Sequence, residues 1–305
     1  MKSIIKGVYK PLFFLLLAVA VTGSLLAIVN PKVEKKKVLE RTVKLTSSQK
    51  VEIENSFGNV TVTNRPGNEM HIKVTAIANA NTDQKAQEIL DRISMEFSEG
   101  NTIRYETDIK GSGNSKGKTH MEINVELSLP EGNSLEIENS FGATSIPNRN
   151  GLTELEQKFG DLSTGSLSRV KEISVEFGSL KAQTLTGGNM SFKYSDIQIA
   201  ELNGSINSTY EFCKSSKLSF GNDLSKINIK NAYSDLSIDV PSNFSGDFRI
   251  RTSFGELINK SGISIKATEE DNDFGPKFDK DYEGKSGTGK CVVNIKSSFG
   301  KIKLN

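Results

Sequence analysis

A short phrase returns along most of this 305-residue chain: an alternating apolar segment, then Phe-Gly or Tyr-Ser, then a small or polar residue, then a second apolar segment. The copies are centred on Phe57, Phe141, Phe159, Phe177, Tyr194, Phe220, Tyr233, Phe254 and Phe299. From Phe159 to Phe177 is 18 residues, and from Phe177 to Tyr194 is 17. Such a short, nearly fixed period is typical of solenoids, in which each unit completes its core only by stacking on its neighbours.

Each copy predicts two strands joined by a corner. Leu155, Gln157 and Phe159 alternate with polar neighbours, and a period of two indicates a strand. The following Gly, Asn or Asp tolerates the positive φ of a tight corner. We therefore expect the aromatic residue to point inward at a bend, with neighbouring copies stacked roughly 4.8 Å apart. An ordinary antiparallel sheet with Phe-Gly turns is the alternative.

The later copies are less regular. The segment Thr209-Tyr210-Glu211-Phe212 is interpreted as a degenerate copy centred on Tyr210. Residues 266–289 break the pattern and predict a loop excursion, because they are first acidic and then glycine-rich. Phe274-Gly275 within them is followed by Pro276, which cannot donate to a strand ladder, so this pair is not counted as a copy.

Residues 1–30 predict an export segment. Lys2, Lys6 and Lys10 give a basic start, and residues 12–29 carry no charge. Small residues near Ala18-Val19-Ala20 favour a cleaved signal peptide, but an 18-residue uncharged stretch is also long enough for a retained membrane anchor. In either case the rest of the chain is expected in the periplasm or at the cell surface, and the membrane is a partner only through residues 12–29 if they stay uncleaved.

Residues 31–130 predict an N-terminal α+β cap. A charged lead-in at 31–48 is followed by several strands and by one helix at 82–93. In that helix Ala86, Ile89, Leu90 and Ile93 share one stripe. Residues 131–305 form the repeating body. A cap is needed because an open solenoid end exposes unpaired strand edges.

Composition narrows the class of partner. Thirty-nine Lys and Arg nearly balance 37 Asp and Glu, which argues against nucleic acid, since nucleic-acid-binding proteins usually carry a basic excess.

The sequence offers little for catalysis or for a cofactor. His71 and His120 lie on apparent strands, with too few neighbouring ligands or bases for a zinc site or an acid–base pair. Asp161, Asp196 and Asp235 follow aromatic corners and would line up in stacked copies, as a calcium or sugar site requires. Corner geometry alone also explains them, because Asp suits turns, so we assign no catalytic, cofactor or metal site.

The two cysteines, Cys213 and Cys291, could pair in an exported protein. They occupy different places in their copies, and cysteine is often buried as a free thiol, so two buried free thiols are the favoured interpretation.

Several segments together resemble a known bacterial family. They are Glu54-Asn55-Ser56-Phe57-Gly58-Asn59-Val60, the helix Lys85-Ala86-Gln87-Glu88-Ile89-Leu90, Thr252-Ser253-Phe254-Gly255 and Ser297-Ser298-Phe299-Gly300-Lys301-Ile302. Over about residues 45–305 the chain is similar to exported adhesin-like domains described as auto-transporter adhesin heads of the GIN type. The resemblance implies a mainly β chain folded as a right-handed parallel β-solenoid, or β-helix, with no site residues to transfer.

Three functions are compatible with these observations. The first is a non-enzymatic, adhesin-like envelope or surface protein that presents a β face to an envelope glycan or a protein. The second is a polysaccharide-acting lyase or hydrolase built on a β-helix, for which Asp161, Asp196 and Asp235 are the available carboxylates. The third is a membrane-anchored component of envelope assembly or stress.

Overall fold

The alternating segments form strands in a computed structural model that describes residues 33–111, 119–268 and 278–305. These residues hold 22 strands and one α-helix, which confirms a mainly β chain. Residues 32–305 form one unit. The expected export segment and Phe274-Gly275-Pro276 lie outside the described residues. Across the described ranges, no helix combines the length and the hydropathy that a membrane crossing requires.

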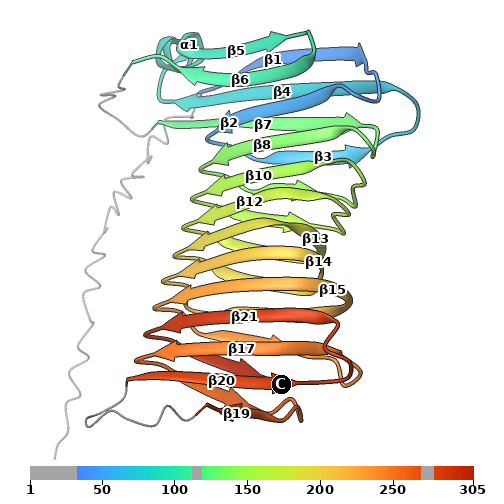
Figure 1. The fold of residues 1–305 in the computed structure, drawn as a ribbon. Helices are drawn as coiled ribbons and strands as arrows, with labels where there is room; N and C mark the ends of the chain where they lie inside the picture. Colours follow the sequence, from blue (N-terminus) through green and yellow to red (C-terminus); the bar gives the residue numbers. More distant parts are fainter. Residues whose placement is uncertain (1–32, 112–118, 269–277) are drawn as a thin grey trace, which may run out of the picture. The chain divides into compact units, whose positions relative to one another are not determined.

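The strands form two ladders of hydrogen-bonded neighbours (Figure 1). Ladder 1 runs in space through β5 (Ile93–Ser98), β6 (Thr102–Ile109), β2 (Lys50–Ser56), β8 (Ser134–Ser140), β10 (Thr153–Lys158), β12 (Val170–Glu176), the second halves of β13 (Ser179–Lys193), β14 (Asp196–Glu211) and β15 (Ser216–Ala232), β21 (Cys291–Ser298), β17 (Gly246–Ser253), β20 (Asp279–Lys285) and β19 (Ile265–Ala267). Ladder 2 runs through β1 (Val33–Lys44), β4 (Glu69–Ala80), β7 (His120–Leu129), β3 (Val60–Asn64), β9 (Thr144–Ile146), β11 (Asp161–Thr164), the first halves of β13, β14 and β15, β16 (Leu236–Asp239), β22 (Lys301–Leu304) and β18 (Glu256–Asn259).

Strands from successive copies run parallel. Leu155 on β10 pairs with Ile137 on β8 and with Ile173 on β12, so equivalent positions of three copies form one row. This parallel order continues from β6 to β17 in ladder 1 and from β7 to β18 in ladder 2. Antiparallel pairs occur at the ends of the ladders, such as β1 with β4 and β17 with β20. We call one strand of ladder 1 together with the following strand of ladder 2 a layer. An ordinary antiparallel sheet is therefore excluded for these layers.

Between the ladder ends, every second side chain of most strands is buried, whereas the end strands β1, β5, β18, β19 and β20 bury one side chain or none. The burial alternates along β2, β8 and β10, as the period of two predicts. The buried side chains join in one hydrophobic cluster that extends from Val43 to Leu304. Each layer supplies a few apolar residues to this cluster, so no layer has a complete core of its own.

The expected inward orientation of the corner aromatics is wrong. Phe159 is 47% exposed and takes φ +53°, and the other corner rings are equally exposed. The aromatic residue, rather than the glycine, adopts the left-handed backbone, which turns its ring outward. Gly160 is required for a different reason: a Cβ there would lie 1.8 Å from the carbonyl oxygen of Gly142 in the next layer.

The corner rings stack into one column on the surface. Neighbouring centroids are 4.6–5.0 Å apart and the planes are within 17° of parallel. In spatial order the column is Phe57, Phe141, Phe159, Phe177, Tyr194, Phe212, Tyr233, Phe299, Phe254 and Phe278. Two sequence assignments are corrected by it: Phe212, not Tyr210, is the corner residue of its copy, and Phe220 is buried within β15 rather than forming a corner.

Buried polar groups support the corners from inside. Asn139 Nδ2 donates to the Gly58 carbonyl (3.2 Å), and Gln157 Nε2 donates to the Gly142 carbonyl (2.7 Å). The bonds from Asn139 and Gln157 satisfy corner carbonyl oxygens that lie outside the regular strand pairing. Where serine replaces the corner glycine, Ser195 Oγ donates to the Lys193 carbonyl (2.7 Å), which also accepts the Phe177 amide (3.1 Å).

The last layers do not follow chain order. The C-terminal strands β21 and β22 insert between the layer of β15 and β16 and the layer of β17 and β18. The expected excursion at 266–289 is not wholly a loop, since β20 pairs antiparallel with β17. The apolar–polar alternation of residues 279–285 is too short and too polar to predict a strand from sequence. Pairing with β17 stabilises β20.

At the opposite end, the predicted helix is confirmed as α1 (Asp83–Asp91). Thr82 Oγ1 accepts a bond from the Lys85 amide (3.3 Å), and Ala86 and Leu90 are buried. Ile93 instead begins β5. The charged lead-in forms β1, paired along its length with β4, where charged side chains suit an edge strand.

Candidate functional site

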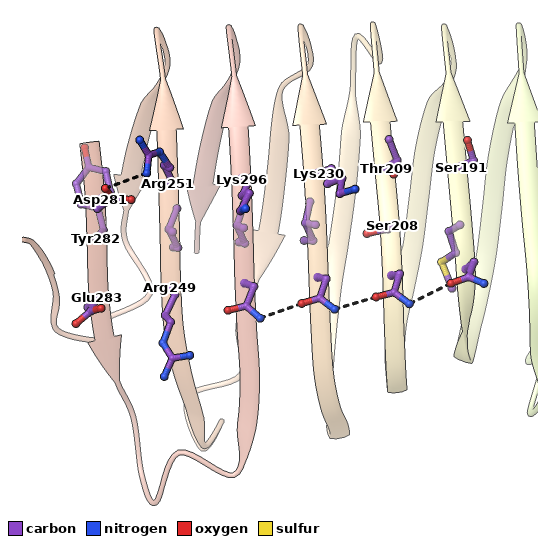
Figure 2. A pocket seen from close by; sticks show the side chains of 18 of the residues that line it. Ser191, Ser208, Thr209, Lys230, Arg249, Arg251, Asp281, Tyr282, Glu283 and Lys296 are labelled. Carbon is purple, nitrogen blue, oxygen red and sulfur yellow. Dashed lines mark hydrogen bonds and ion pairs between the residues drawn. The ribbon is translucent and has the colours of Figure 1, made fainter. Parts of the chain in front are cut away.

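A groove of about 1090 Å³ lies on the outer face of ladder 1. Its floor is formed by β13, β14, β15, β21 and β17, and β20 contributes Asp281, Tyr282 and Glu283 (Figure 2). Thr268, which follows β19, also lines the groove. The outward side chains along this floor are polar or cationic, while their inward neighbours belong to the core. The groove is therefore a polar surface on a rigid support.

One row of the floor consists of four asparagines joined by hydrogen bonds. Asn294 Nδ2 donates to Asn228 Oδ1 (2.9 Å), Asn228 to Asn207 (2.8 Å), and Asn207 to Asn189 (3.0 Å), as the dashed lines in Figure 2 show. The row holds the amides in one orientation. Each amide has two hydrogens and two lone pairs, and the row uses only part of this capacity, so it can also bind a ligand.

A row of cations runs beside the asparagines. Lys230 on β15 pairs in register with Lys296 on β21, which pairs with Arg251 on β17. Arg251 is held by Asp279 (2.9 Å) and Asp281 (3.6 Å) of β20. Lys230 and Lys296 are exposed and make no ion pair within the described residues. The groove therefore contains two ammonium groups that a ligand anion can reach.

Sequence reasoning did not find this cation row. Its members are far apart in the chain, and they become neighbours only because β21 inserts between β15 and β17. The asparagines were detectable in principle, since Asn189 and Asn207 precede the aromatics Tyr194 and Phe212 by the same five residues.

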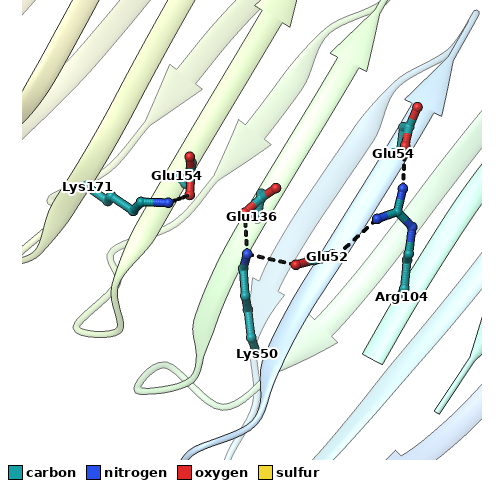
Figure 3. A network of polar contacts seen from close by, with 7 residues as sticks. All are labelled: Lys50, Glu52, Glu54, Arg104, Glu136, Glu154 and Lys171. Atoms are coloured by element: carbon teal, nitrogen blue, oxygen red, sulfur yellow. Dashed lines mark hydrogen bonds and ion pairs between the residues drawn. The ribbon is translucent and has the colours of Figure 1, made fainter. Parts of the chain in front are cut away.

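The other half of the same face is acidic. Lys50 is hydrogen-bonded to Glu136 and lies 2.7 Å from Glu52, while Arg104 contacts Glu52 (3.4 Å) and Glu54 (2.9 Å) (Figure 3). Although burial acts in the opposite direction, the hydrogen bonds to Glu136 and Glu52 raise the pKa of Lys50. These cations neutralise part of the carboxylate rows.

Glu138 lies among these carboxylates. Glu138 is exposed, but partial desolvation of its carboxyl group and the nearby charges of Glu156, Glu54 and Glu136 raise its pKa. This half of the face thus carries an excess of negative charge, and it is a poor surface for an anion.

The three aspartates singled out in the sequence do share a row on ladder 2, but not as neighbours. Ser179 separates Asp161 from Asp196, and its hydroxyl donates to Asp161 Oδ1 (2.7 Å). Asp235 Oδ1 accepts from the Lys301 amide (2.9 Å). Two of the three carboxylates therefore serve the corners, as the turn interpretation expects.

The remaining candidates are scattered. His71 on β4 has its Nε2 2.8 Å from Glu40, whereas His120 on β7 has its Nε2 3.8 Å from Glu122 of the same strand. Within the described ranges, no group of three or more His, Cys, Asp or Glu side chains is placed to hold a metal ion. Cys213 and Cys291 are both buried and free, which confirms the prediction, and burial raises the pKa of the Cys291 thiol to about 11.

Arg149 is the one fully buried cation in the described part of the chain. Its guanidinium donates to Asn64 Oδ1 (3.1 Å) and to the carbonyls of Pro130 (3.0 Å) and Asn133 (2.8 Å). Burial lowers its pKa to about 10. Asn64 ends β3, and Pro130 and Asn133 flank the turn between β7 and β8, so Arg149 is a structural residue that joins neighbouring layers.

Comparison with known proteins gives structural similarities. No protein-family model and no curated protein sequence matches the chain. A "putative adhesin" from Bacteroides fragilis aligns over 88% of this chain and 97% of its own, with 12% identity and a TM-score of 0.45. A "putative cell adhesion protein" from Clostridium sporogenes aligns over 88% and 99%, with 14% identity and a TM-score of 0.29. A "putative lipid binding protein" from Parabacteroides distasonis aligns over 88% and 96%, with 13% identity and a TM-score of 0.31.

Proposed function

We propose that this chain is a non-enzymatic, adhesin-like envelope protein that binds an acidic polysaccharide in the groove of ladder 1. The supporting observation is the pair Lys230 and Lys296, beside the four-asparagine row, on the floor of an open groove. Ammonium groups bind carboxylate, sulfate or phosphate, and amides bind hydroxyl groups. A polymer of repeating units suits this floor because asparagine recurs at the equivalent position of four neighbouring layers.

The proposal includes a fold and a location. We take the stacked layers to be a right-handed parallel β-solenoid, with residues 31–130 as its cap and residues 131–305 as its body. Residues 1–30 export the chain, as a cleaved signal peptide or as an anchor. Mass spectrometry of the N-terminus of the cellular protein distinguishes these two forms, since an anchored protein retains Lys2 and a cleaved one does not.

Binding of alginate oligomers, as a carboxylated linear polysaccharide, tests the proposal by calorimetry. We expect the wild-type protein to bind alginate in preference to neutral cello-oligosaccharides of the same length. The double variant K230E/K296E should lose on the order of tenfold or more in affinity, since each cation makes a charged hydrogen bond.

The matched control is K217E/K303E. Lys217 and Lys303 lie on ladder 2, outside the groove, and the change in net charge is the same. Equal losses in both variants would show that binding depends on total charge alone and would contradict a site in the groove. A reducing-end assay on the same mixtures should stay at background, and turnover of alginate would overturn the non-enzymatic assignment.

A further inference from the structure

The aromatic column is the largest apolar feature on the surface of the described residues. Its ten rings are 41–54% exposed. Since an aromatic side chain offers about 150–250 Å² when buried, each ring leaves roughly 100 Å² uncovered and the column roughly 1,000 Å². A typical monomer has a largest apolar patch of about 300–600 Å², while one side of a standard protein interface buries about 800 Å². The column is large enough to be an interface.

A row of alternating charges borders the column. Lys158, Glu176, Lys193 and Glu211 directly precede four consecutive corner rings, and the strand pairing places them next to each other in this order. Along the row the signs are plus, minus, plus, minus. A row of this kind matches itself when a second copy is reversed, because each cation then faces an anion.

We propose that the column is the interface of a homodimer in which a second copy packs antiparallel against it, about a two-fold axis between Phe177 and Tyr194. The rings of the two columns match in spacing, since both copies have the same distance of 4.6–5.0 Å between neighbouring ring centroids. The axis places Lys158 opposite Glu211 of the second copy and Glu176 opposite Lys193 of the second copy. Such an isologous contact is the commonest form of oligomer.

The opposite flank of the column allows the same arrangement. The two-fold axis brings Ser179 opposite Asp196 of the second copy and Ala143 opposite Asp235 of the second copy. Neither pair brings like charges together. The interface does not include Lys230 or Lys296, so this inference is independent of the proposed function.

Sedimentation velocity on residues 32–305 tests the dimer. This unit contains every residue of the hydrophobic core, from Val43 to Leu304, and can be studied alone. We expect a monomer–dimer equilibrium at micromolar concentrations. K193E should weaken dimerisation by on the order of tenfold or more, because it brings two pairs of like charges together.

The exchange variant E176K/K193E separates contacts between copies from contacts within one. Within one copy it places Lys158 beside a second lysine and Glu211 beside a second glutamate, which is unfavourable. Between antiparallel copies it restores opposite charges, so dimerisation should recover to within about threefold of wild type. Thermal unfolding of each variant controls for loss of fold.

Three results would overturn the proposal. They are a wild-type protein that stays monomeric, a dimer unaffected by K193E, and an exchange variant that fails to recover while folded. Flotation of the monomer with phosphatidylcholine vesicles would instead assign the column to a lipid surface.

Discussion

At the scale of single residues, the corners combine a backbone cost with a ring-stacking gain. Nine corner aromatics have φ between 51° and 62°, a conformation that costs a side-chain-bearing residue about 1–2 kcal/mol. Each inner ring stacks on two neighbours, and each stacked pair contributes about 0.5–1.5 kcal/mol. The stacking therefore offsets the strain, and the effect is shared along the whole column.

This balance gives an unusual order of stabilities at Phe177. Phe177→Ala loses both stacking contacts and keeps the strained backbone, so it should lower the free energy of unfolding by about 2 kcal/mol. Phe177→Gly loses the same contacts but relieves the strain, and its loss should be about 1 kcal/mol smaller. Urea unfolding measures both. Within strands, an alanine variant is usually more stable than a glycine variant. The same order at Phe177 would contradict the account.

Glu138 predicts a dependence on pH. Partial desolvation and the neighbouring carboxylates raise the pKa of Glu138, so the folded chain binds this proton more tightly than the unfolded chain does. Stability is then lost as pH rises above the ordinary value of 4.5 through the raised pKa. Glu138→Gln should raise the melting temperature at neutral pH, and this gain should vanish near pH 3, where both side chains are uncharged.

The matched variant for this prediction is Glu52→Gln. Glu52 contacts Lys50 and Arg104, so its loss should lower the melting temperature at neutral pH. If both variants raise it, general repulsion across the face rather than the position of Glu138 is responsible.

At the scale of strands and layers, most of the strands could be predicted from the sequence, but the order in which the layers stack could not. The alternation of Leu155, Gln157 and Phe159 predicted a strand correctly, but it also suggested that Phe159 points inward. The left-handed turn at the aromatic breaks the alternation there, and sequence spacing does not report φ. For the same reason Tyr210, which continues the alternation, was taken for the corner instead of Phe212.

The groove was missed because it depends on the order of layers. Local patterns identify β17 and β21 as strands but do not state which one stacks on β15. The pairing of Lys230 with Lys296 follows only from that choice. A site assembled across layers is therefore invisible to an inspection of one copy at a time.

The inserted layer gives a test at this scale. Ile295 is buried on β21, between β15 and β17, so Ile295→Ala should cost about 2–4 kcal/mol. Hydrogen exchange should accelerate in residues 226–232 and 246–253, which both pair with β21, and remain slow in β2 at the far end. Lys303→Ala, on the outward side of β22 in the same layer, is the control. Faster exchange in residues 246–253 alone would contradict the insertion.

At the scale of the whole described unit, the outer face of ladder 1 is divided by charge. Glutamates dominate the layers of β2, β8 and β10, whereas the two rows of the groove floor from β13 to β17 consist of asparagine, serine, threonine, lysine and arginine. Because total charge is close to balanced, attraction of an acidic polymer depends on this division and not on net charge. Binding should weaken as salt is added, since the cations are exposed.

Lysine labelling with and without alginate tests the central claim most directly, because it reports where the polymer lies. Mass spectrometry gives the acetylation rate of each lysine in the folded protein. We predict that bound alginate slows acetylation of Lys230 and Lys296 several-fold, while the rates of Lys217 and Lys303 on ladder 2 stay unchanged. Equal protection of all four lysines, or none at Lys230 and Lys296 when alginate is bound, would contradict an acidic-polysaccharide site in the groove.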